Sequence, residues 1–158
     1  MNSNKLDVYP HNFSEKIGYT EVRHILEGYC ASTLGQEEMQ RLEASCDTIE
    51  IARALDESRE MMTILSGESV LPSLALVDCS EVLRRIRPQG TYIEEEELLD
   101  LLRMLETLHS LQHFFLEEHT TGERAAETFA YTYPRLASLL EDTPSFPKIE
   151  SHLRSLLT

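Results

Sequence analysis

The chain has 158 residues, which is about the length of one domain and enough to bury a core without a metal ion or disulfide. Asp and Glu outnumber Lys and Arg by 28 to 14, so the formal net charge is −14, which argues against non-specific nucleic-acid binding over the whole surface. No apolar run approaches the length of a membrane span, and no charged-then-apolar signal segment opens the chain.

The three cysteines form no recognisable metal or redox motif. Cys30, Cys46 and Cys79 are odd in number, and none of their spacings is CxxC. Without a secretory signal, this pattern indicates a cytoplasmic protein whose thiols are buried as small apolar side chains. A catalytic thiol would need a neighbouring base, which the sequence does not supply.

The first three helices are predicted from capping residues followed by apolar side chains at helical spacing. Thr20 is the candidate N-cap of the first helix. Thr33 opens the second with a Thr-x-x-Gln capping box, and Asp47 caps the third, which is expected to stop near Gly67. The expected buried faces are Val22, Ile25, Leu26 and Tyr29, then Gly35, Met39 and Leu42, then Ala52, Leu55, Ser58, Met62 and Leu65.

The middle of the chain predicts a short helix and then the longest one. Asp78 caps the short helix, and Pro88 and Gly90 close it. A capping box from Thr91 to Glu94 opens the long helix, which is expected to run to about His119. The apolar residues of the short helix are Cys79, Val82, Leu83 and Ile86, and those of the long one are Leu98, Leu101, Leu102, Leu105, Leu108, Leu111 and Phe115. A stripe that long indicates a helix with several packing neighbours.

Towards the end of the chain the sequence predicts a short helix over Glu123–Ala130 and two helices with Pro134 and Pro147 in their first turns. The apolar residues of the last helix are Ile149, Leu153, Leu156 and Leu157. Because they continue to the penultimate residue, we interpret the chain as a fragment truncated from a longer one. The fold class predicted is all-α, an irregular bundle of seven or eight helices without strands.

One basic cluster stands out in this acidic chain. Arg84, Arg85 and Arg87 flank the apolar stripe of the short helix, so all three can reach solvent together. They are the candidate nucleic-acid or partner contact. The alternative is that they pair with the acidic surface.

Two other groups of polar residues have an ordinary structural interpretation. His109 and His113 lie one helical turn apart, as zinc ligands can, but Ser110 stands where the HExxH motif has Glu. The other conceivable ligands are Glu106, Glu117 and His119. An exposed histidine pair is the simpler interpretation. The carboxylates of Glu94–Glu97 fan around a first helical turn, where they favour the helix dipole rather than forming an acid–base pair or a cation site.

Motifs for nucleotide binding and for a serine nucleophile are absent. The sequence has no GxxxxGK[ST], no GxGxxG and no GxSxG, and its six glycines are isolated. We therefore predict no catalytic residue, no metal and no cofactor within these residues.

Several short motifs resemble, in the same order, the bacterial MutS-II family, MutS paralogues that lack the mismatch-reading domain. They are Tyr29-Cys30-Ala31-Ser32-Thr33-Leu34-Gly35-Gln36-Glu37, Leu55-Asp56-Glu57-Ser58-Arg59-Glu60, Asp78, Gly90 with Glu97-Leu98-Leu99, and Tyr133-Pro134 with Leu136. The chain departs from the family at Ser45-Cys46, where a Pro-Ser pair is usual, and at Met61, where Ala is usual. The resemblance covers roughly residues 13–158.

The resemblance implies that residues 13–158 are an N-terminal part of a MutS-type core, with residues 1–12 as a flexible segment before it. A longer parent would carry a P-loop ATPase domain using ATP and Mg²⁺ and often an Smr endonuclease domain, and would form a homodimer. Such proteins are associated with branched-DNA binding, suppression of recombination and splitting of stalled, collided ribosomes. The fragment itself is expected to bind DNA weakly or not at all.

Three hypotheses for function follow from these patterns. In the first, the chain is a non-catalytic helical segment of such a DNA- or ribosome-acting ATPase. In the second, it is a free-standing helical adaptor that binds a partner helix through an apolar groove. The third, an enzyme or metal protein using His109 and His113, has the least support.

Overall fold

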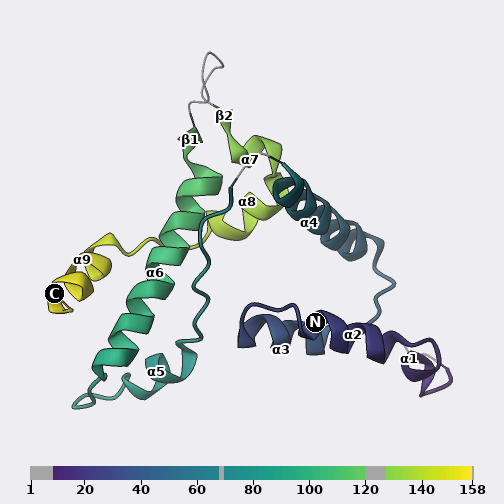
Figure 1. The fold of residues 1–158 in the computed structure, drawn as a ribbon, viewed down its shortest axis with the longest axis horizontal. Coiled ribbons are helices and arrows are strands. Elements are labelled where there is room, and N and C mark those ends of the chain that lie inside the picture. Colours follow the sequence, from purple (N-terminus) through teal and green to yellow (C-terminus); the bar gives the residue numbers. More distant parts are fainter. Residues whose placement is uncertain (1–8, 68–69, 120–126, 158) are drawn as a thin grey trace. The chain divides into compact units, whose positions relative to one another are not determined.

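A computed structural model of the chain describes residues 9–67, 70–119 and 127–157, and within these ranges it contains nine helices and two short strands (Figure 1). The chain divides into two compact units, Met1–Ala52 and Arg53–Thr158. The predicted all-α class is confirmed, with one helix more than the upper estimate. None of the described helices combines the length and the apolar character that a bilayer span requires.

The first unit contains three short helices, α1 (Phe13–Lys16), α2 (Tyr19–Glu27) and α3 (Thr33–Arg41). Gly18, at φ +74°, is the N-cap of α2, so the predicted cap at Thr20 is wrong. Helix α3 begins at Thr33 as predicted, but its cap is Ser32, whose Oγ accepts the Gly35 N–H at 3.1 Å. The predicted separation of residues 1–12 from the rest stays a prediction, since residues 1–8 lie outside the described ranges.

No described residue of the first unit is fully buried. The α2 stripe that the sequence predicts to face a core is largely exposed, at 51% for Val22, 61% for Ile25 and 83% for Tyr29. The physical reason is that α2 approaches α3 with a different flank, on which the Tyr19 hydroxyl donates to the Leu42 carbonyl at 3.4 Å. The predicted core face of α2 is therefore wrong within this unit.

Helix α4 (Thr48–Ser66) starts as the sequence predicts. The Asp47 carboxylate accepts the N–H groups of Ile49 and Glu50 at 2.9 and 3.2 Å, which satisfies two of the free donors in the first turn. The expected buried face is wrong, however, because Met62 and Leu65 are exposed. The side chain that enters the core is Ile64, with an exposure of 0%.

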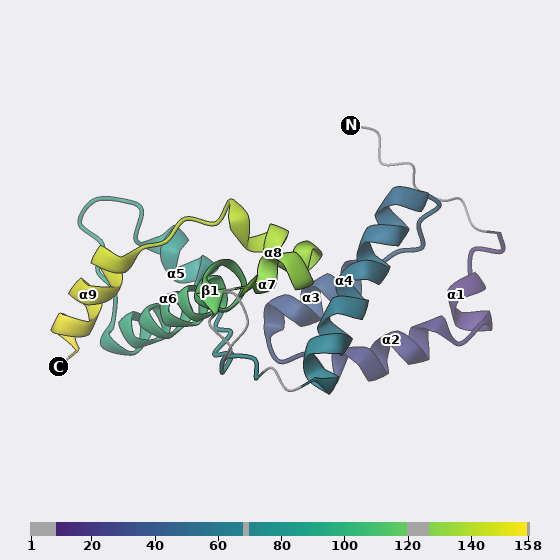
Figure 2. The ribbon, with the colours of Figure 1, turned by 90° about the horizontal axis from the view of Figure 1, so that it is seen from above.

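The second unit is organised along α6 (Glu95–Leu116), which packs against α7 (Phe129–Thr132), α8 (Pro134–Glu141) and α9 (Pro147–Leu156), as the long apolar stripe predicts (Figures 1 and 2). One apolar cluster joins α4, the end of α6 and α8. Its buried members are Ile64, Phe114, Phe115, Tyr133, Leu136 and Ala137. A second cluster, Leu102, Leu105 and Leu153, holds α9 on the first half of α6. Leu157 packs against that cluster, whereas Leu156 is exposed.

The ends of α6 differ from those predicted. Glu94 is the N-cap instead of Thr91, and the Glu97 carboxylate accepts the Glu94 N–H at 3.0 Å. Beyond Leu116 the chain leaves the helix and forms β1 (Glu118–His119), which pairs antiparallel with β2 (Glu127–Thr128), so the prediction of no strands is wrong by this short ladder. The predicted helix over Glu123–Ala130 falls mainly outside the described residues.

A buried hydroxyl fixes the extended segment that leads to α5 (Ser80–Arg85). Thr107, in the middle of α6, accepts the Ala75 N–H at 3.2 Å through its Oγ1 and also hydrogen bonds the Arg103 carbonyl at 2.8 Å. Because the Thr107 side chain is buried, water does not reach its hydroxyl, and these bonds satisfy the hydroxyl instead. The segment before α5 is thereby held against α6.

Candidate functional site

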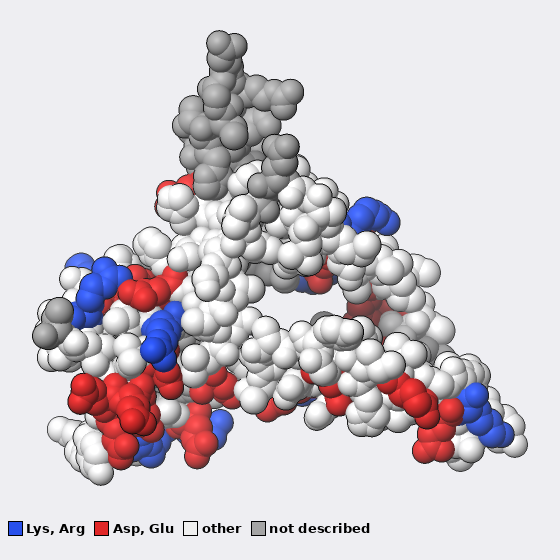
Figure 3. Space-filling model, in the orientation of Figure 1, with Lys and Arg blue, Asp and Glu red and all other residues white. Residues whose placement is uncertain are grey.

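Arg84 and Arg85 lie in the last turn of α5, and Arg87 follows it. All three are exposed, but Arg85 is already committed: its guanidinium forms an ion pair with Glu97 and donates to the Tyr92 carbonyl at 3.3 Å. Figure 3 shows acidic and basic side chains mixed over this end of the second unit. The cluster therefore does not present three free positive charges, and its role as a contact site stays a prediction.

Hydrogen bonds lower two carboxyl pKa values around α5. The Glu94 N–H, with a further contribution from Arg85, holds the pKa of Glu97 below its ordinary value. Hydrogen bonds from Ser80, with a smaller effect of Arg84, lower the pKa of Asp78. Within the described part of the chain, Arg84 makes no hydrogen bond or ion pair. Both carboxylates thus act as local helix-end acceptors, but the N-cap of α5 is Cys79, so the predicted cap at Asp78 is wrong by one residue: Asp78 precedes the cap and its carboxylate accepts the Ser80 N–H at 2.9 Å.

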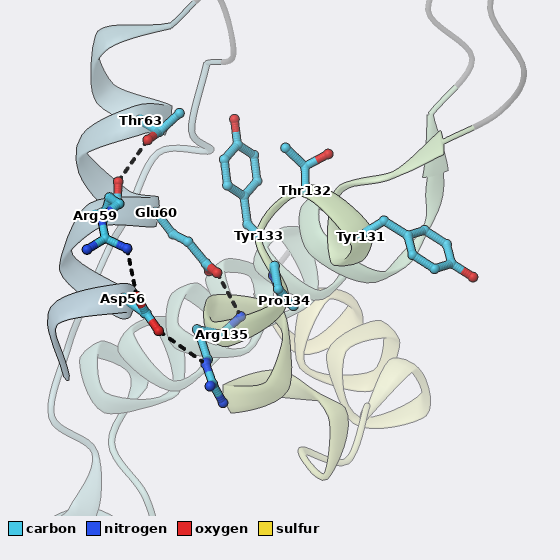
Figure 4. Close-up of a pocket in the computed structure, with 9 residues that line it drawn as sticks. All are labelled: Asp56, Arg59, Glu60, Thr63, Tyr131, Thr132, Tyr133, Pro134 and Arg135. Atoms are coloured by element: carbon cyan, nitrogen blue, oxygen red, sulfur yellow. Dashed lines mark hydrogen bonds and ion pairs between the residues drawn. The ribbon is translucent and has the colours of Figure 1, made fainter. Parts of the chain in front are cut away.

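A shallow pocket of about 450 Å³ lies between α4, α7 and the start of α8 (Figure 4). Most of the residues that line it are polar or charged. The residues lining it are Asp56, Arg59, Glu60, Thr63, Tyr131, Thr132, Tyr133, Pro134 and Arg135.

Glu60 joins the two walls of this pocket. Helix α8 begins with Pro134, which has no N–H, and the next two N–H groups have no acceptor within the helix. Glu60 supplies both acceptors: one oxygen lies 3.1 Å from the Arg135 nitrogen and the other 2.9 Å from the Leu136 nitrogen. A carboxylate at this position also interacts favourably with the helix dipole.

The remaining charges of the pocket balance each other. Asp56 accepts from Arg59 at 2.8 Å, and its second oxygen lies 4.0 Å from Nε of Arg135 (Figure 4). Two carboxylates and two guanidinium groups therefore leave no net charge to attract an ionic substrate. The geometry is that of a joint between helices, and the sequence reasoning missed it. The available signal was Pro134 preceded by Tyr133, a helix start without a capping side chain of its own.

The histidine pair is divided between two carboxylate partners. His109 Nδ1 lies 3.7 Å from Glu150 of α9, and His113 Nε2 lies 3.3 Å from Glu117. In residues 9–67, 70–119 and 127–157 no three His, Cys, Asp or Glu side chains are grouped as a metal site would need. The side chain of His119 lies outside the described residues.

The Glu94–Glu97 run has the place that its structural interpretation implies, but of the three thiols predicted to be buried only Cys79 is, since Cys30 is of intermediate exposure. Glu95, Glu96 and Glu97 form the first turn of α6. Cys79 is buried, and burial raises the pKa of its thiol. Cys46 is exposed, contrary to the prediction of a buried thiol.

The motifs behind the family resemblance lie at helix junctions. Ser32 caps α3, and a Cβ on Gly35 would make ordinary van der Waals contact with the Cys30 Cβ at 3.5 Å, so α3 begins close to the end of the preceding loop. Glu60 and the Tyr133–Leu136 stretch meet where α4 caps α8. Gly90, at φ +88°, makes the turn before α6, in a conformation that favours glycine.

Comparison with known proteins identifies relatives of one kind, each named endonuclease MutS2. The chain is 32% identical to that of Clostridium botulinum (strain Eklund 17B) over 114 residues, which are 72% of this chain and 14% of the relative. It is 26% identical to that of Alkaliphilus oremlandii over 135 residues, 85% of this chain and 16% of the relative. With that of Levilactobacillus brevis the identity is 28% over 139 residues, 88% and 16%.

No protein-family model and no solved structure matches the chain. The chain thus corresponds to 14–16% of the length of these three relatives, and the similarity covers most of its own length. With the motifs at the helix junctions, this identifies the chain as a helical segment related to the MutS2 endonucleases.

Proposed function

We propose that this chain serves as a non-catalytic helical segment of a MutS2-type protein, whose residues hold helices in place rather than act on a substrate. The observation that supports this role is the use of its motif residues. Glu60, Ser32 and Glu97 are occupied in capping helices or joining them. The charged groups of the pocket are likewise paired with each other or with the α8 N-terminus.

In this proposal the reactive chemistry belongs to other parts of a longer protein. The relatives are named endonucleases, and we propose that nuclease activity, ATP and Mg²⁺ are properties of such a protein outside these residues. The chain itself lacks a GxxxxGK[ST] sequence, which cradles phosphates. DNA or a stalled ribosome would be its target, and a homodimer its assembly.

Assays on the 158-residue chain test the non-catalytic role. Incubation with branched DNA and Mg²⁺ should give no cleavage, and calorimetric titration with ATP should give no saturable heat. Cleavage that co-purifies with the chain and is lost on mutating His109 or Glu150 would contradict the proposal and favour an enzyme.

The arginine cluster is tested separately by the salt dependence of DNA binding. Because Arg85 is paired with Glu97, only Arg84 and Arg87 remain for phosphates, so binding should be weak, with a log–log salt slope of about −1.8. Replacing Arg84 and Arg87 by alanine should abolish it. Arg103→Ala is the matched control, since Arg103 is an exposed arginine paired with Asp100. Tight binding that survives the double substitution would show that the contact lies elsewhere.

A free-standing adaptor is the second candidate, and one observation favours it. The predicted core face of α4 is open: Leu55, Met62 and Leu65 are 59–71% exposed, and Leu55 and Met62 line a hollow of about 470 Å³ together with Ser58, Arg59, Thr63 and Ser66. The natural reading frame separates the two proposals. Continuation into a GxxxxGK[ST] sequence supports the MutS2-type protein, whereas a stop codon after Thr158 supports the adaptor.

A further inference from the structure

In the first unit, α2 packs against α3 with a side of the helix that carries polar residues. On α2, the residues of intermediate exposure are Tyr19, Thr20, Arg23 and Glu27. Of these, Tyr19, Arg23 and Glu27 follow each other at one helical turn, and the Tyr19 hydroxyl donates to the Leu42 carbonyl at the end of α3. The apolar residues lie on another side of the helix. These are Val22, Ile25, Leu26 and Tyr29, here called the α2 stripe, with exposures of 42–83%.

This arrangement leaves the unit without a core of its own. None of its described residues, 9–52, is buried, although α2 carries Val22, Ile25 and Leu26 at the spacing of a single helical face and Tyr29 follows just after its C-cap, Gly28. A stretch of this length depends on burying such a face to offset the entropy of ordering its chain. The α2 stripe is thus a surface that becomes stabilising only when something covers it.

The charge around the stripe indicates what kind of molecule covers it. Residues 9–52 carry eight carboxylates and three Lys or Arg side chains, a net charge of −5. Arg41 is already paired with Glu37 and Glu38, at 3.0 and 2.6 Å. Glu21 lies beside Ile25 on the helical wheel, at the margin of the stripe. A basic partner complements this field.

The same charge argues against a second copy as the occupant. Two chains that each carry −14 repel, and residues 9–52 contribute −5 to that charge on each. We propose that the α2 stripe is a docking surface for an amphipathic helix of another polypeptide, one whose apolar face is flanked by Lys and Arg. The helix lies in the stripe with its basic side chains near Glu21 and its neighbours. This goes beyond the helix-joining role proposed above, which concerns the second unit.

The test uses the whole chain and a synthetic probe. The probe is an amphipathic peptide with a leucine stripe flanked by lysines, and the matched control peptide has the same stripe flanked by glutamates. Fluorescence anisotropy measures binding, and amide hydrogen exchange locates it. The lysine peptide should bind at least about tenfold more tightly than the glutamate peptide, because like charges at an interface oppose association. It should slow exchange of the α2 amides.

Substitutions in the chain keep the proposal falsifiable. Ile25→Glu and Tyr29→Ala should each weaken binding about tenfold, as expected for central contacts of an interface. Gln36→Glu, on exposed α3, adds the same charge away from the stripe and should change binding little. Since these side chains are exposed, the substitutions should not unfold the unit.

Several outcomes would overturn the proposal. They are equal binding of both peptides, binding of neither, and binding unaffected by Ile25→Glu and Tyr29→Ala. Slow exchange of the α2 amides in the free chain would show that the chain covers the stripe itself. A dimer in sedimentation equilibrium that Ile25→Glu dissociates would identify a second copy as the occupant. None of these results depends on cleavage or ATP assays, so failure here leaves the proposed function untouched.

Discussion

Replacing Glu60 by alanine tests the joint between α4 and α8. The substitution removes both acceptors for the N–H groups of Arg135 and Leu136 while leaving α4 with a good helix former. The Leu136 amide is partly buried, so water replaces its lost partner poorly. The N-cap residue, Tyr133, makes no side-chain cap bond that could replace the lost acceptors.

The expected cost follows from these contacts. Loss of a helix cap costs about 0.5–2 kcal/mol, and hydrogen bonds to a charged group contribute about 1.5–3 kcal/mol when buried. Because the Arg135 amide is exposed, we expect Glu60→Ala to lower the free energy of unfolding of the second unit by about 1–3 kcal/mol. Glu60→Gln keeps one acceptor oxygen and should cost about half as much.

Hydrogen exchange of the Leu136 amide measures this locally. A loss of about 1–3 kcal/mol corresponds to exchange that is about 5- to 150-fold faster. Glu57→Ala is the matched control on the same helix. It breaks only an exposed ion pair, in which Arg53 Nε lies 2.8 Å from the Glu57 carboxylate, and should cost about 0.3–0.5 kcal/mol. Equal effects of Glu60→Ala and Glu57→Ala on α8 exchange would refute the capping role.

Three further substitutions probe the second unit. Ile64→Ala should lower the free energy of unfolding by about 2–5 kcal/mol because Ile64 is fully buried, whereas Leu65→Ala on the exposed face should cost under about 0.5 kcal/mol. Urea unfolding compares the two variants, and equal losses of stability would contradict the assignment of Ile64 to the buried face of α4. Thr107→Val keeps the side-chain shape but leaves the partly buried Ala75 N–H without its acceptor, so it should cost about 1–3 kcal/mol in the same assay, and a neutral result would contradict this. The pKa of Glu97 is lowered in the folded chain, so the Glu97 carboxylate stabilises the fold at pH values above its ordinary pKa of 4.5. This contribution is lost as the pH falls through the folded-state pKa. Glu97→Gln should therefore flatten the loss of melting temperature below pH 4.5, and Glu96→Gln should not.

Helix starts were predictable where a single residue type decides them. Asp47 and Pro134 mark the starts of α4 and α8 as expected. Asp47 accepts a hydrogen bond from the first turn of α4, and Pro134 occupies a first-turn position of α8 because it has no backbone N–H to leave unpaired. The start of α6, by contrast, could not be predicted from Thr91. Its hydroxyl donates to the Pro88 carbonyl at 2.7 Å, and Glu94 takes the cap position instead, with the capping box four residues long from Glu94.

The buried face of α4 could not be predicted from periodicity alone. The helix carries two apolar rows, one with Met62 and Leu65 and one with Met61 and Ile64, and both have helical spacing. The second row enters the core because Glu60 beside it caps a helix 75 residues further along the chain. A charged residue such as Glu60 beside an apolar row indicates, from the sequence alone, that this row faces solvent. That indication is reversed only when the distant N–H groups that bind Glu60 are known.

The arginine cluster illustrates the same limit at the candidate site. A helical wheel places Arg84, Arg85 and Arg87 at the surface, and they are there. The wheel contains no information on Glu97, which belongs to the next helix and pairs with Arg85. The wheel located these side chains at the surface, but whether their charge is free depends on the neighbouring helix, and so the number of arginines available for phosphate was overestimated.

The two units differ in what would stabilise them, and this difference bears on function. In the second unit, α6 contributes side chains to both apolar clusters, so a change in either is transmitted to the helix that anchors α8 and α9. The first unit buries none of its described residues and has no such anchor. Segments with few buried contacts open at low free energy, and a ligand that covers their apolar face changes their stability most. Binding is therefore expected to alter the order of the first unit, while the second supplies a scaffold that is already folded.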